Sequence, residues 1–322
     1  MNAIVQDRYG NSDVLVLQDI DRPSVGTGEV LIRVEAASAF IGDWHVMTGL
    51  PYLGRLAFGV RKPKLRVRGQ DVAGHVAAVG EDVERFHVGD EVFGVCDGSF
   101  AEYAIARSGR VAAKPASLTF DEAAAVPTTG MTALQGLRDR GNIEAGQRVL
   151  ILGAAGGVGS FAVQIAKAFG TSVTGVCSTS QVETVRSLGA DEVIDYTRDD
   201  FADLPPRYDV ILDTAGNRTL SHLRRGLAPR GTLVIGGGEG GGKWFGGVDR
   251  QLRAMFLSPF VGQRLRTFIT KPNSDDLTAL KELIDAGKVR PVIGKTFALS
   301  DVPAAMRYVE AGHPQGKVLI SI

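Results

Sequence analysis

Seven residues near the middle of the chain combine little side-chain bulk with a position suited to binding a phosphate. They read Gly153-Ala154-Ala155-Gly156-Gly157-Val158-Gly159 and follow the apolar run at 148–152. A helical pattern of apolar residues begins directly after them. Because amide groups at a helix N-terminus bind anions, a strand, a glycine turn and a helix in this order form a dinucleotide pyrophosphate site. The spacing therefore predicts dinucleotide binding, and a purely structural turn is the alternative.

The residues of this turn have separate expected roles. In the dinucleotide fingerprint G-x-G-x-x-G, Ala154 stands where the first glycine is usual. Gly156 is expected to let the backbone approach the phosphate, and Gly159 to let the helix pack closely on the strand. The bare motif is a weak signal, but its place in a series of strands and helices makes it specific. We expect the binding residues to be Ala154, Gly156, Gly157, Val158 and Gly159.

The end of the second predicted strand bears on the choice between NADH and NADPH. Proteins that bind NAD usually carry an acidic residue there, which holds the ribose hydroxyls. Residues 177–180 contain no acid. Ser178 and Thr179 can donate to a 2′-phosphate, which a carboxylate would repel, although helix capping is the competing explanation for both. The sequence therefore favours NADPH, with Tyr196 as a further contact; no basic residue stands at the strand end, and Arg186 lies further along.

Hydrophobic periodicity predicts the elements that position these residues. The first third alternates with period two at 30–36, 74–80 and 91–95, as half-buried strands do, and suggests a small barrel or sandwich. From residue 120 the chain alternates strands and helices, which is typical of βαβ units on a parallel sheet. The final strand is expected to return to the first domain. The predicted helices cover 161–169, 181–188 and 275–287, and the further strands cover 148–152, 172–177, 192–195, 208–213, 232–235 and 317–322.

Composition limits the classes of function. A chain of 322 residues suggests two domains. Its 36 basic and 36 acidic residues balance, which argues against nucleic acid or an anionic membrane as the main partner. The basic segment 61–68 is interpreted as a solvated loop. Two cysteines, no leader pattern and no long apolar run predict a cytoplasmic location and no membrane span. Histidines without ligand spacing are interpreted as structural or surface residues, namely His75, His87, His222 and His313.

Short motifs are spread along nearly the whole chain. Among them are Gly69-Gln70-Asp71-Val72-Ala73-Gly74, Val88-Gly89-Asp90, Phe100-Ala101-Glu102-Tyr103, the run at 123–133, the glycine turn and Gly316-Lys317-Val318. Together they resemble the medium-chain dehydrogenase/reductase superfamily, in its zinc-independent quinone oxidoreductase (zeta-crystallin-like) branch. The resemblance implies an α/β fold with a Rossmann doubly wound parallel sheet and a β-rich, GroES-like catalytic domain. It implies a catalytic domain at 1–122, to which 260–322 returns, a dinucleotide-binding domain at 123–259, and a homodimer joined edge to edge through the nucleotide-binding sheets.

Two positions separate this chain from the zinc alcohol dehydrogenases of that superfamily. Those enzymes place a cysteine where this chain has Phe40 and a histidine where it has Gln70, and the four-cysteine structural lobe is absent. Zinc needs thiolate, imidazole or carboxylate ligands, and phenylalanine supplies none. We therefore expect no metal site and an already electron-poor substrate, a quinone or an α,β-unsaturated carbonyl (enone). The alternatives are an alcohol dehydrogenase, against which Phe40 and Gln70 count, and a non-catalytic NADPH-binding protein of the crystallin type.

The resemblance also implies individual site residues. Asp43 and His45 lie on the loop that lines the substrate cleft in relatives, and Tyr52 follows it. A histidine can donate a proton or act as a polar wall residue, and Tyr52 has the same two interpretations. Thr128 matches the segment near the nicotinamide ribose, with helix capping as its alternative. The expected contacts through backbone or charge are Gly236, Gly237 and Gly238, near the nicotinamide carboxamide, and Lys317, either at the cofactor or solvated.

Overall fold

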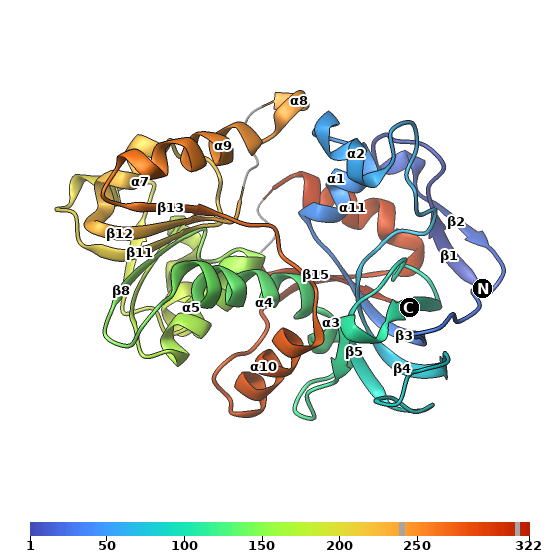
Figure 1. Cartoon of the computed structure of the whole chain (residues 1–322). Helices are drawn as coiled ribbons and strands as arrows, with labels where there is room; N and C mark the ends of the chain where they lie inside the picture. Colours follow the sequence, from blue (N-terminus) through green and yellow to red (C-terminus); the bar gives the residue numbers. More distant parts are fainter. Residues whose placement is uncertain (238–241, 313–315) are drawn as a thin grey trace. The chain divides into compact units, whose positions relative to one another are not determined.

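A computed structural model describes residues 1–237, 242–312 and 316–322 (Figure 1). The chain divides into two compact units. Unit 1 comprises Met1–Met131, Lys271–Ala286 and Pro291–Ile322, and unit 2 comprises Thr132–Thr270 and Gly287–Arg290. Unit 1 continues beyond residue 122 because α3 (Phe120–Ala124) packs against strands of the unit 1 sheet.

The sheet of unit 2 has six strands in the order β10-β9-β8-β11-β12-β13. Every neighbouring pair is parallel, which confirms the predicted doubly wound sheet. Helices lie on both faces of the sheet (Figure 1). The strands are β8 (Arg148–Leu152), β9 (Ser172–Cys177), β10 (Glu192–Asp195), β11 (Tyr208–Asp213), β12 (Leu227–Ile235) and β13 (Arg264–Thr267). The helices are α5 (Gly157–Ala168), α6 (Val182–Ser187), α7 (Leu220–Gly226), α8 (Gly242–Phe245) and α9 (Val248–Leu257).

The apolar runs of the sequence form the buried centre of this sheet. Leu150 and Ile151 of β8 are fully buried, as is Ile211 of β11. From β8 the chain winds outward through β9 to β10, and then crosses to β11 on the other side of β8. The carboxyl end of β8 is therefore the topological switch point, where open α/β sheets bind ligands. The glycine turn follows directly at that end.

The sheet of unit 1 is mostly antiparallel and has the order β14-β15-β3-β4-β5-β7, with β6 also pairing with β3. The C-terminal strand β15 lies antiparallel to β3, so that Val318 is opposite Ala39. This pairing brings Lys317 next to the segment that leads into α1 (Ile41–Thr48). The strands are β3 (Glu29–Ala39), β4 (Asp71–Val79), β5 (Glu91–Val95), β6 (Tyr103–Arg107), β7 (Val111–Ala113), β14 (Ile293–Ala298) and β15 (Lys317–Ser321), and β1 (Asn2–Val5) pairs separately with β2 (Val16–Asp19).

Capping residues fix the helix ends of unit 1. Thr119 accepts a hydrogen bond from the Glu122 amide at 3.2 Å, which starts α3. The predicted helix at 275–287 is α10 (Ser274–Asp285), and Gly287 follows it with φ of +69°. The other helices are α2 (Arg55–Phe58), α4 (Pro127–Leu134) and α11 (Val302–Glu310). A seven-residue π-helix, Gln135–Gly141, continues α4.

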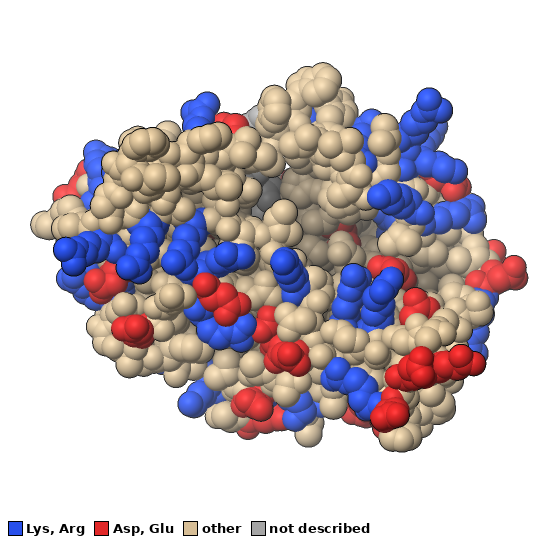
Figure 2. Space-filling model, viewed as in Figure 1, with Lys and Arg blue, Asp and Glu red and all other residues tan. Residues whose placement is uncertain are grey.

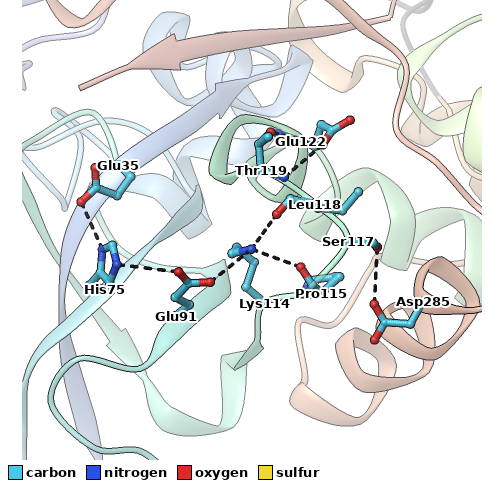
Figure 3. Close-up of polar contacts among 10 residues, drawn as sticks. All are labelled: Glu35, His75, Glu91, Lys114, Pro115, Ser117, Leu118, Thr119, Glu122 and Asp285. Atoms are coloured by element: carbon cyan, nitrogen blue, oxygen red, sulfur yellow. Dashed lines mark hydrogen bonds and ion pairs between the residues drawn. The ribbon is translucent and has the colours of Figure 1, made fainter.

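A chain of polar contacts links three strands of unit 1 to the segment before α3 (Figure 3). His75 on β4 lies 3.1 Å from Glu35 and 4.0 Å from Glu91. Glu91 pairs with Lys114 at 3.2 Å, and the Lys114 ammonium also donates to the Leu118 carbonyl at 2.6 Å. These contacts confirm the structural interpretation of His75.

The surface agrees with the balanced composition, because both signs of charge are scattered over the face shown in Figure 2. The basic segment 61–68 is only partly a solvated loop. Arg66 is exposed and pairs with Asp7 at 2.7 Å, whereas Arg68 is buried and donates to the Leu65 carbonyl. Within the described ranges, no helix has the length and hydropathy needed to cross a membrane.

Candidate functional site

The glycine turn of unit 2 requires glycine at both of its ends. Gly153 has φ of +75°, a conformation that other residues rarely adopt. A Cβ atom at Gly159 would lie 2.0 Å from the Gly153 carbonyl oxygen, closer than any real contact. The start of α5 therefore lies directly against the end of β8, as the spacing predicts. Ala154 is buried behind the turn, and its amide donates to the Val176 carbonyl at 3.0 Å.

The N-terminus of α5 fits an anion. Its N-cap is Gly156, which has no side chain, and no side chain forms a cap hydrogen bond there. Gly156, Gly157 and Val158 are half-buried rather than sealed inside the unit. Amide groups in the first turn of a helix have no partner within the helix, so they can donate to a ligand. This arrangement suits a dinucleotide pyrophosphate, whose charge the helix dipole also favours.

The sequence predicts no acidic residue at the end of β9, but the structure places one beside it. Residues 177–180 contain no acid, but Asp195 of the neighbouring strand β10 is in register with Cys177. The Thr179 hydroxyl donates to the Asp195 carboxylate at 2.6 Å, and this bond is the main reason that the pKa of Asp195 is lowered. An ionised acid therefore lies at the strand end after all. The sequence could not show it, because the contact depends on the register of two strands.

The segment after β10 supplies the basic residue that the sequence analysis did not find. The Arg198 guanidinium lies 3.7 Å from the Asp195 carboxylate, and its side chain is 73% exposed. Tyr196 is also exposed, while its amide donates to the Cys177 carbonyl at 3.0 Å. Ser178 forms no cap hydrogen bond and no side chain caps α6, so the capping explanation for Ser178 is wrong. The Thr179 hydroxyl donates its one hydrogen to Asp195, which leaves none for the predicted bond to a 2′-phosphate.

The segment after β12 carries the residues predicted near the nicotinamide. The amides of Gly236 and Gly237 both donate to the Asp213 carbonyl, at 2.9 and 3.1 Å. Because these two amides are hydrogen-bonded to the end of β11, they cannot donate to a ligand. Gly238, the third residue of that prediction, lies outside the described residues.

In unit 1, two of the predicted residues, Thr128 and Lys317, contact the fully buried carboxylate of Asp71. Thr128 donates to it through its hydroxyl at 2.5 Å and its amide at 3.1 Å, and Ser38 through its hydroxyl at 3.0 Å. The Lys317 ammonium lies 3.4 Å away, and its side chain is 2% exposed. The interpretation of Lys317 as a solvated charge is therefore wrong. The Thr128 hydroxyl, in the first turn of α4, donates to Asp71.

Asp43 is a second buried acid near this cluster. Its carboxylate accepts a hydrogen bond from the Phe40 amide at 3.1 Å, at the start of α1. The pKa of Asp43 is raised to about 7, mainly by burial and in part by the negative charge of Asp71, while the hydrogen bond from the Phe40 amide and the charges of Lys317 and Arg68 oppose the shift. The carboxyl group is therefore poised to exchange a proton near neutral pH. The Lys317 ammonium also lies 5.2 Å from the centre of the Phe40 ring.

His45 and Tyr52 are held by contacts within their own segment. The His45 Nδ1 atom lies 2.7 Å from the Leu50 carbonyl oxygen. Since a carbonyl only accepts, Nδ1 carries the hydrogen, and neutral His45 presents Nε2 as an acceptor. His45 can then donate from Nε2 only as the imidazolium. The Arg55 guanidinium stacks 4.8 Å from the centre of the Tyr52 ring and 4.5 Å from that of Tyr9.

Comparisons with known proteins agree with both units. Residues 26–116 match the alcohol dehydrogenase GroES-like domain, and residues 188–320 match a family described as zinc-binding dehydrogenase. The mouse (Mus musculus) protein "NAD(P)H oxidoreductase RTN4IP1, mitochondrial" is 35% identical over 100% of this chain and 89% of its own length. The tomato (Solanum lycopersicum) 2-methylene-furan-3-one reductase is 35% identical over 99% of this chain and 79% of its own.

A solved structure supports the same assignment. The quinone oxidoreductase from Coxiella burnetii superposes with a TM-score of 0.86 at 29% identity, over 100% of this chain and 99% of that one. The chain therefore belongs to the medium-chain dehydrogenase/reductase superfamily. Within it, the chain lies in the zinc-independent quinone oxidoreductase branch.

One of the two matching families is described as zinc-binding. Across residues 1–237, 242–312 and 316–322, no three His, Cys, Asp or Glu side chains gather into a group that could hold a metal ion. Phe40 and Gln70 stand at two positions where zinc enzymes of the superfamily carry ligands.

The raised pKa of Asp43 predicts a specific dependence of stability on pH. The folded chain binds this proton more tightly than the unfolded chain, whose carboxyl has the ordinary value of 3.8 against about 7 when folded. The contribution of Asp43 to the free energy of unfolding is therefore greatest at low pH and falls as pH rises from about 4 to about 7, by at most about 4 kcal/mol. Asp43→Asn cannot ionise but keeps an oxygen for the Phe40 amide, so we expect it to lose this decline.

Urea unfolding of both proteins at about pH 5 and about pH 8 measures the difference. Asp97→Asn, at an exposed acid of the same unit, is the control and should keep the decline of the parent. Parallel pH profiles for the parent and Asp43→Asn would contradict the assignment.

Proposed function

We propose that this chain is an NADPH-dependent, zinc-independent oxidoreductase that transfers hydride to a quinone or an enone. The observation that carries the proposal is the N-terminus of α5. Its N-cap residue is a glycine, no side chain caps it, and it lies at the switch point of a parallel sheet. The names of the relatives, an NAD(P)H oxidoreductase and a reductase of a methylene-furanone, support the same chemistry.

The residue types favour a substrate that is already electron-poor. Bound NADPH would supply the hydride, and the protein would supply orientation and electrostatics. Phe40 and Gln70 replace two residue types that bind zinc, and zinc is what polarises an unconjugated carbonyl in related enzymes. In a quinone or an enone, conjugation delocalises the charge that arrives with the hydride. These substrates therefore need less help from a Lewis acid.

The residues on α1 are candidates for handling the proton that completes the reduction. His45 is oriented by its bond to the Leu50 carbonyl, so the proton it can give is on Nε2 of the imidazolium. Asp43 is buried and has a pKa of about 7, so it can give up or take up a proton near neutral pH. Its charge beside Asp71 and Lys317 changes when it does so. Water is the other proton source. Tyr52 is proposed as a wall residue, held under Arg55.

Preference for NADPH over NADH rests on the exposed cation near the end of β9. Arg198 is positioned to pair with a 2′-phosphate, and Tyr196 offers an exposed ring to the adenosine. The Asp195 carboxylate opposes the phosphate, but its oxygens already accept from Thr179 and from the amide and hydroxyl of Thr197. We propose that the charge of Arg198 outweighs that of Asp195.

We also propose a homodimer through unit 2. The strand β13 is the last strand of its sheet, so one of its edges has no pairing strand among the described residues. Beside it, α9 and the residues after it expose an apolar stripe at helical spacing, formed by Leu252, Met255, Phe256 and Phe260. The surface over α9 is largely free of charged side chains in Figure 2. For location we propose the cytoplasm, although the names of several relatives include mitochondrial or chloroplastic.

A kinetic assay tests the proposed function. The protein, treated with a metal chelator, is mixed with NADPH or NADH and with 1,4-benzoquinone, but-3-en-2-one or an unconjugated ketone. We expect oxidation of NADPH with the two conjugated substrates, unaffected by the chelator, and little with the unconjugated ketone. Activity confined to the unconjugated ketone or lost with the chelator would favour an alcohol dehydrogenase. NADPH binding without turnover of any substrate would favour the non-catalytic alternative.

Substitution of Arg198 tests the cofactor preference. Arg198→Ala should lower kcat/KM for NADPH by about tenfold, because one charge-assisted contact is lost, and should leave kcat/KM for NADH within about twofold. Arg186→Ala is the matched control, since Arg186 is an exposed arginine that pairs with Glu183 at 2.6 Å. Equal losses with both cofactors, or no loss with NADPH, would contradict the role of Arg198.

A further inference from the structure

A buried ion pair joins the end of β11 to α9 in unit 2. Asp213 is the last residue of β11 and is fully buried, and the Arg250 side chain on α9 is 12% exposed. The Arg250 Nη1 atom lies 2.6 Å from the Asp213 carboxylate. Burying two charges is costly, and such a pair is tolerated only where further hydrogen bonds satisfy both partners. The other contacts of these two residues therefore show which backbone segments the ion pair fixes in place.

Asp213 binds the backbone that follows two neighbouring strands. Its carboxylate accepts from the amides of Ala215 and Gly216, at 3.2 and 3.1 Å, which fixes the turn after β11. Its main-chain carbonyl accepts from the amides of Gly236 and Gly237, which fixes the segment after β12. One residue thus sets the backbone direction at two adjacent strand ends.

Arg250 binds the same segments from the other side. Its Nη2 atom donates to the Gly237 carbonyl at 2.7 Å, and Nη1 also donates to the Arg218 carbonyl at 3.0 Å. Both amides of the Gly236-Gly237 pair and the carbonyl of Gly237 are therefore occupied. Among the hydrogen bonds of the described residues, the Gly236 carbonyl accepts none, so it remains as an acceptor for a ligand.

The held segment lies against the glycine turn. The Thr214 hydroxyl, one residue after Asp213, donates to the Leu152 carbonyl at 2.6 Å, at the end of β8. A Cβ atom at Gly153 would lie 2.9 Å from that hydroxyl, and one at Gly237 would lie 2.4 Å from the Thr214 carbonyl oxygen. The Gly237 backbone therefore packs directly against Thr214, which in turn bonds to the end of β8.

We infer that Arg250 is a positioning residue, which acts through Asp213 and Gly237 to hold the Gly236 carbonyl toward the nicotinamide half of the dinucleotide. The inference rests on the proposed function. A dinucleotide whose pyrophosphate lies at the end of β8 has its adenosine half over β9 and extends in the other direction over β11 and β12. The nicotinamide carboxamide carries N–H donors, which a fixed carbonyl at the end of β12 accepts.

The test compares two ligands that differ in whether they reach this segment. NADPH contains the nicotinamide, and adenosine 2′,5′-bisphosphate contains only the adenosine end. Their dissociation constants are measured by calorimetry for the parent, Arg250→Met, Arg250→Lys and Arg253→Met. Arg253 is the matched control, because it lies on the same helix with a side chain that is 77% exposed.

We expect Arg250→Met to weaken NADPH binding by about tenfold or more and to change binding of the bisphosphate by less than about twofold. Arg250→Lys keeps the charge but loses the forked geometry, so it should restore part of the NADPH affinity. Arg253→Met should change neither ligand. In the cofactor-free chain, amide hydrogen exchange should become faster at 213–216 and 236–237 in Arg250→Met, and should stay unchanged at 153–159.

If Arg250→Met does not fold, the double variant Asp213→Asn with Arg250→Gln replaces the ion pair by neutral partners, and the same comparison is made with it. The inference is overturned if the Arg250 variant binds both ligands more weakly by the same factor, or if it binds NADPH as tightly as the parent does. A parent chain that binds NADPH but reduces no quinone or enone overturns the proposed reaction alone, and the binding comparison still decides the role of Arg250. A parent chain that binds no dinucleotide overturns both.

Discussion

The close approach of α5 to β8 is the constraint on which the rest of unit 2 depends. A side chain at position 159 would meet the Gly153 carbonyl at 2.0 Å, so this approach is possible only with glycine. It places the first amides of the helix at the carboxyl end of β8. The two neighbours of β8 in the sheet, β9 and β11, then supply the flanks of the proposed dinucleotide site. Asp195 and Arg198 belong to one flank, and Asp213 and Arg250 to the other.

The two units use buried charge for different purposes. In unit 2, Asp213 and Arg250 pair with each other and form further hydrogen bonds to the backbone, although the buried Nε of Arg250 has no partner among the described residues. In unit 1, Asp71 accepts from two hydroxyls and pairs with Lys317, while Asp43 keeps a pKa of about 7. The first arrangement fixes a shape, because all its charges are matched. The second retains a group that can change its charge near neutral pH, which is what proton transfer requires.

Much of this architecture could be predicted from local sequence patterns. The apolar runs at 148–152 and 208–213 predict central strands, and the glycine turn after the first of them predicts the ligand site. Phe40 and Gln70 predict that zinc ligands are missing, since residue type alone excludes them. Such features need only neighbouring residues or a single side chain, and the structure confirms the two central strands among them. The short strand β13 was not predicted, because Arg264 and Arg266 interrupt its apolar character.

Contacts between distant residues could not be predicted in this way. Asp195 meets Thr179 across 16 positions and Arg250 meets Asp213 across 37, and both contacts depend on strand register and helix placement. From the sequence, Lys317 is either a cofactor contact or a solvated charge in a terminal strand, and only the pairing of that strand with β3 brings it to Asp71. The prediction of NADPH over NADH suffered most from this limit. The acid near the end of β9, Asp195, belongs to the neighbouring strand β10, and the base, Arg198, belongs to the segment after β10.

The decisive measurement is a crystal structure of the chain with NADPH bound. In it we expect pyrophosphate oxygens about 3 Å from the backbone nitrogens of residues 157–159, with the 2′-phosphate at Arg198 and the carboxamide at the Gly236 carbonyl. A pyrophosphate bound away from the N-terminus of α5 would contradict it.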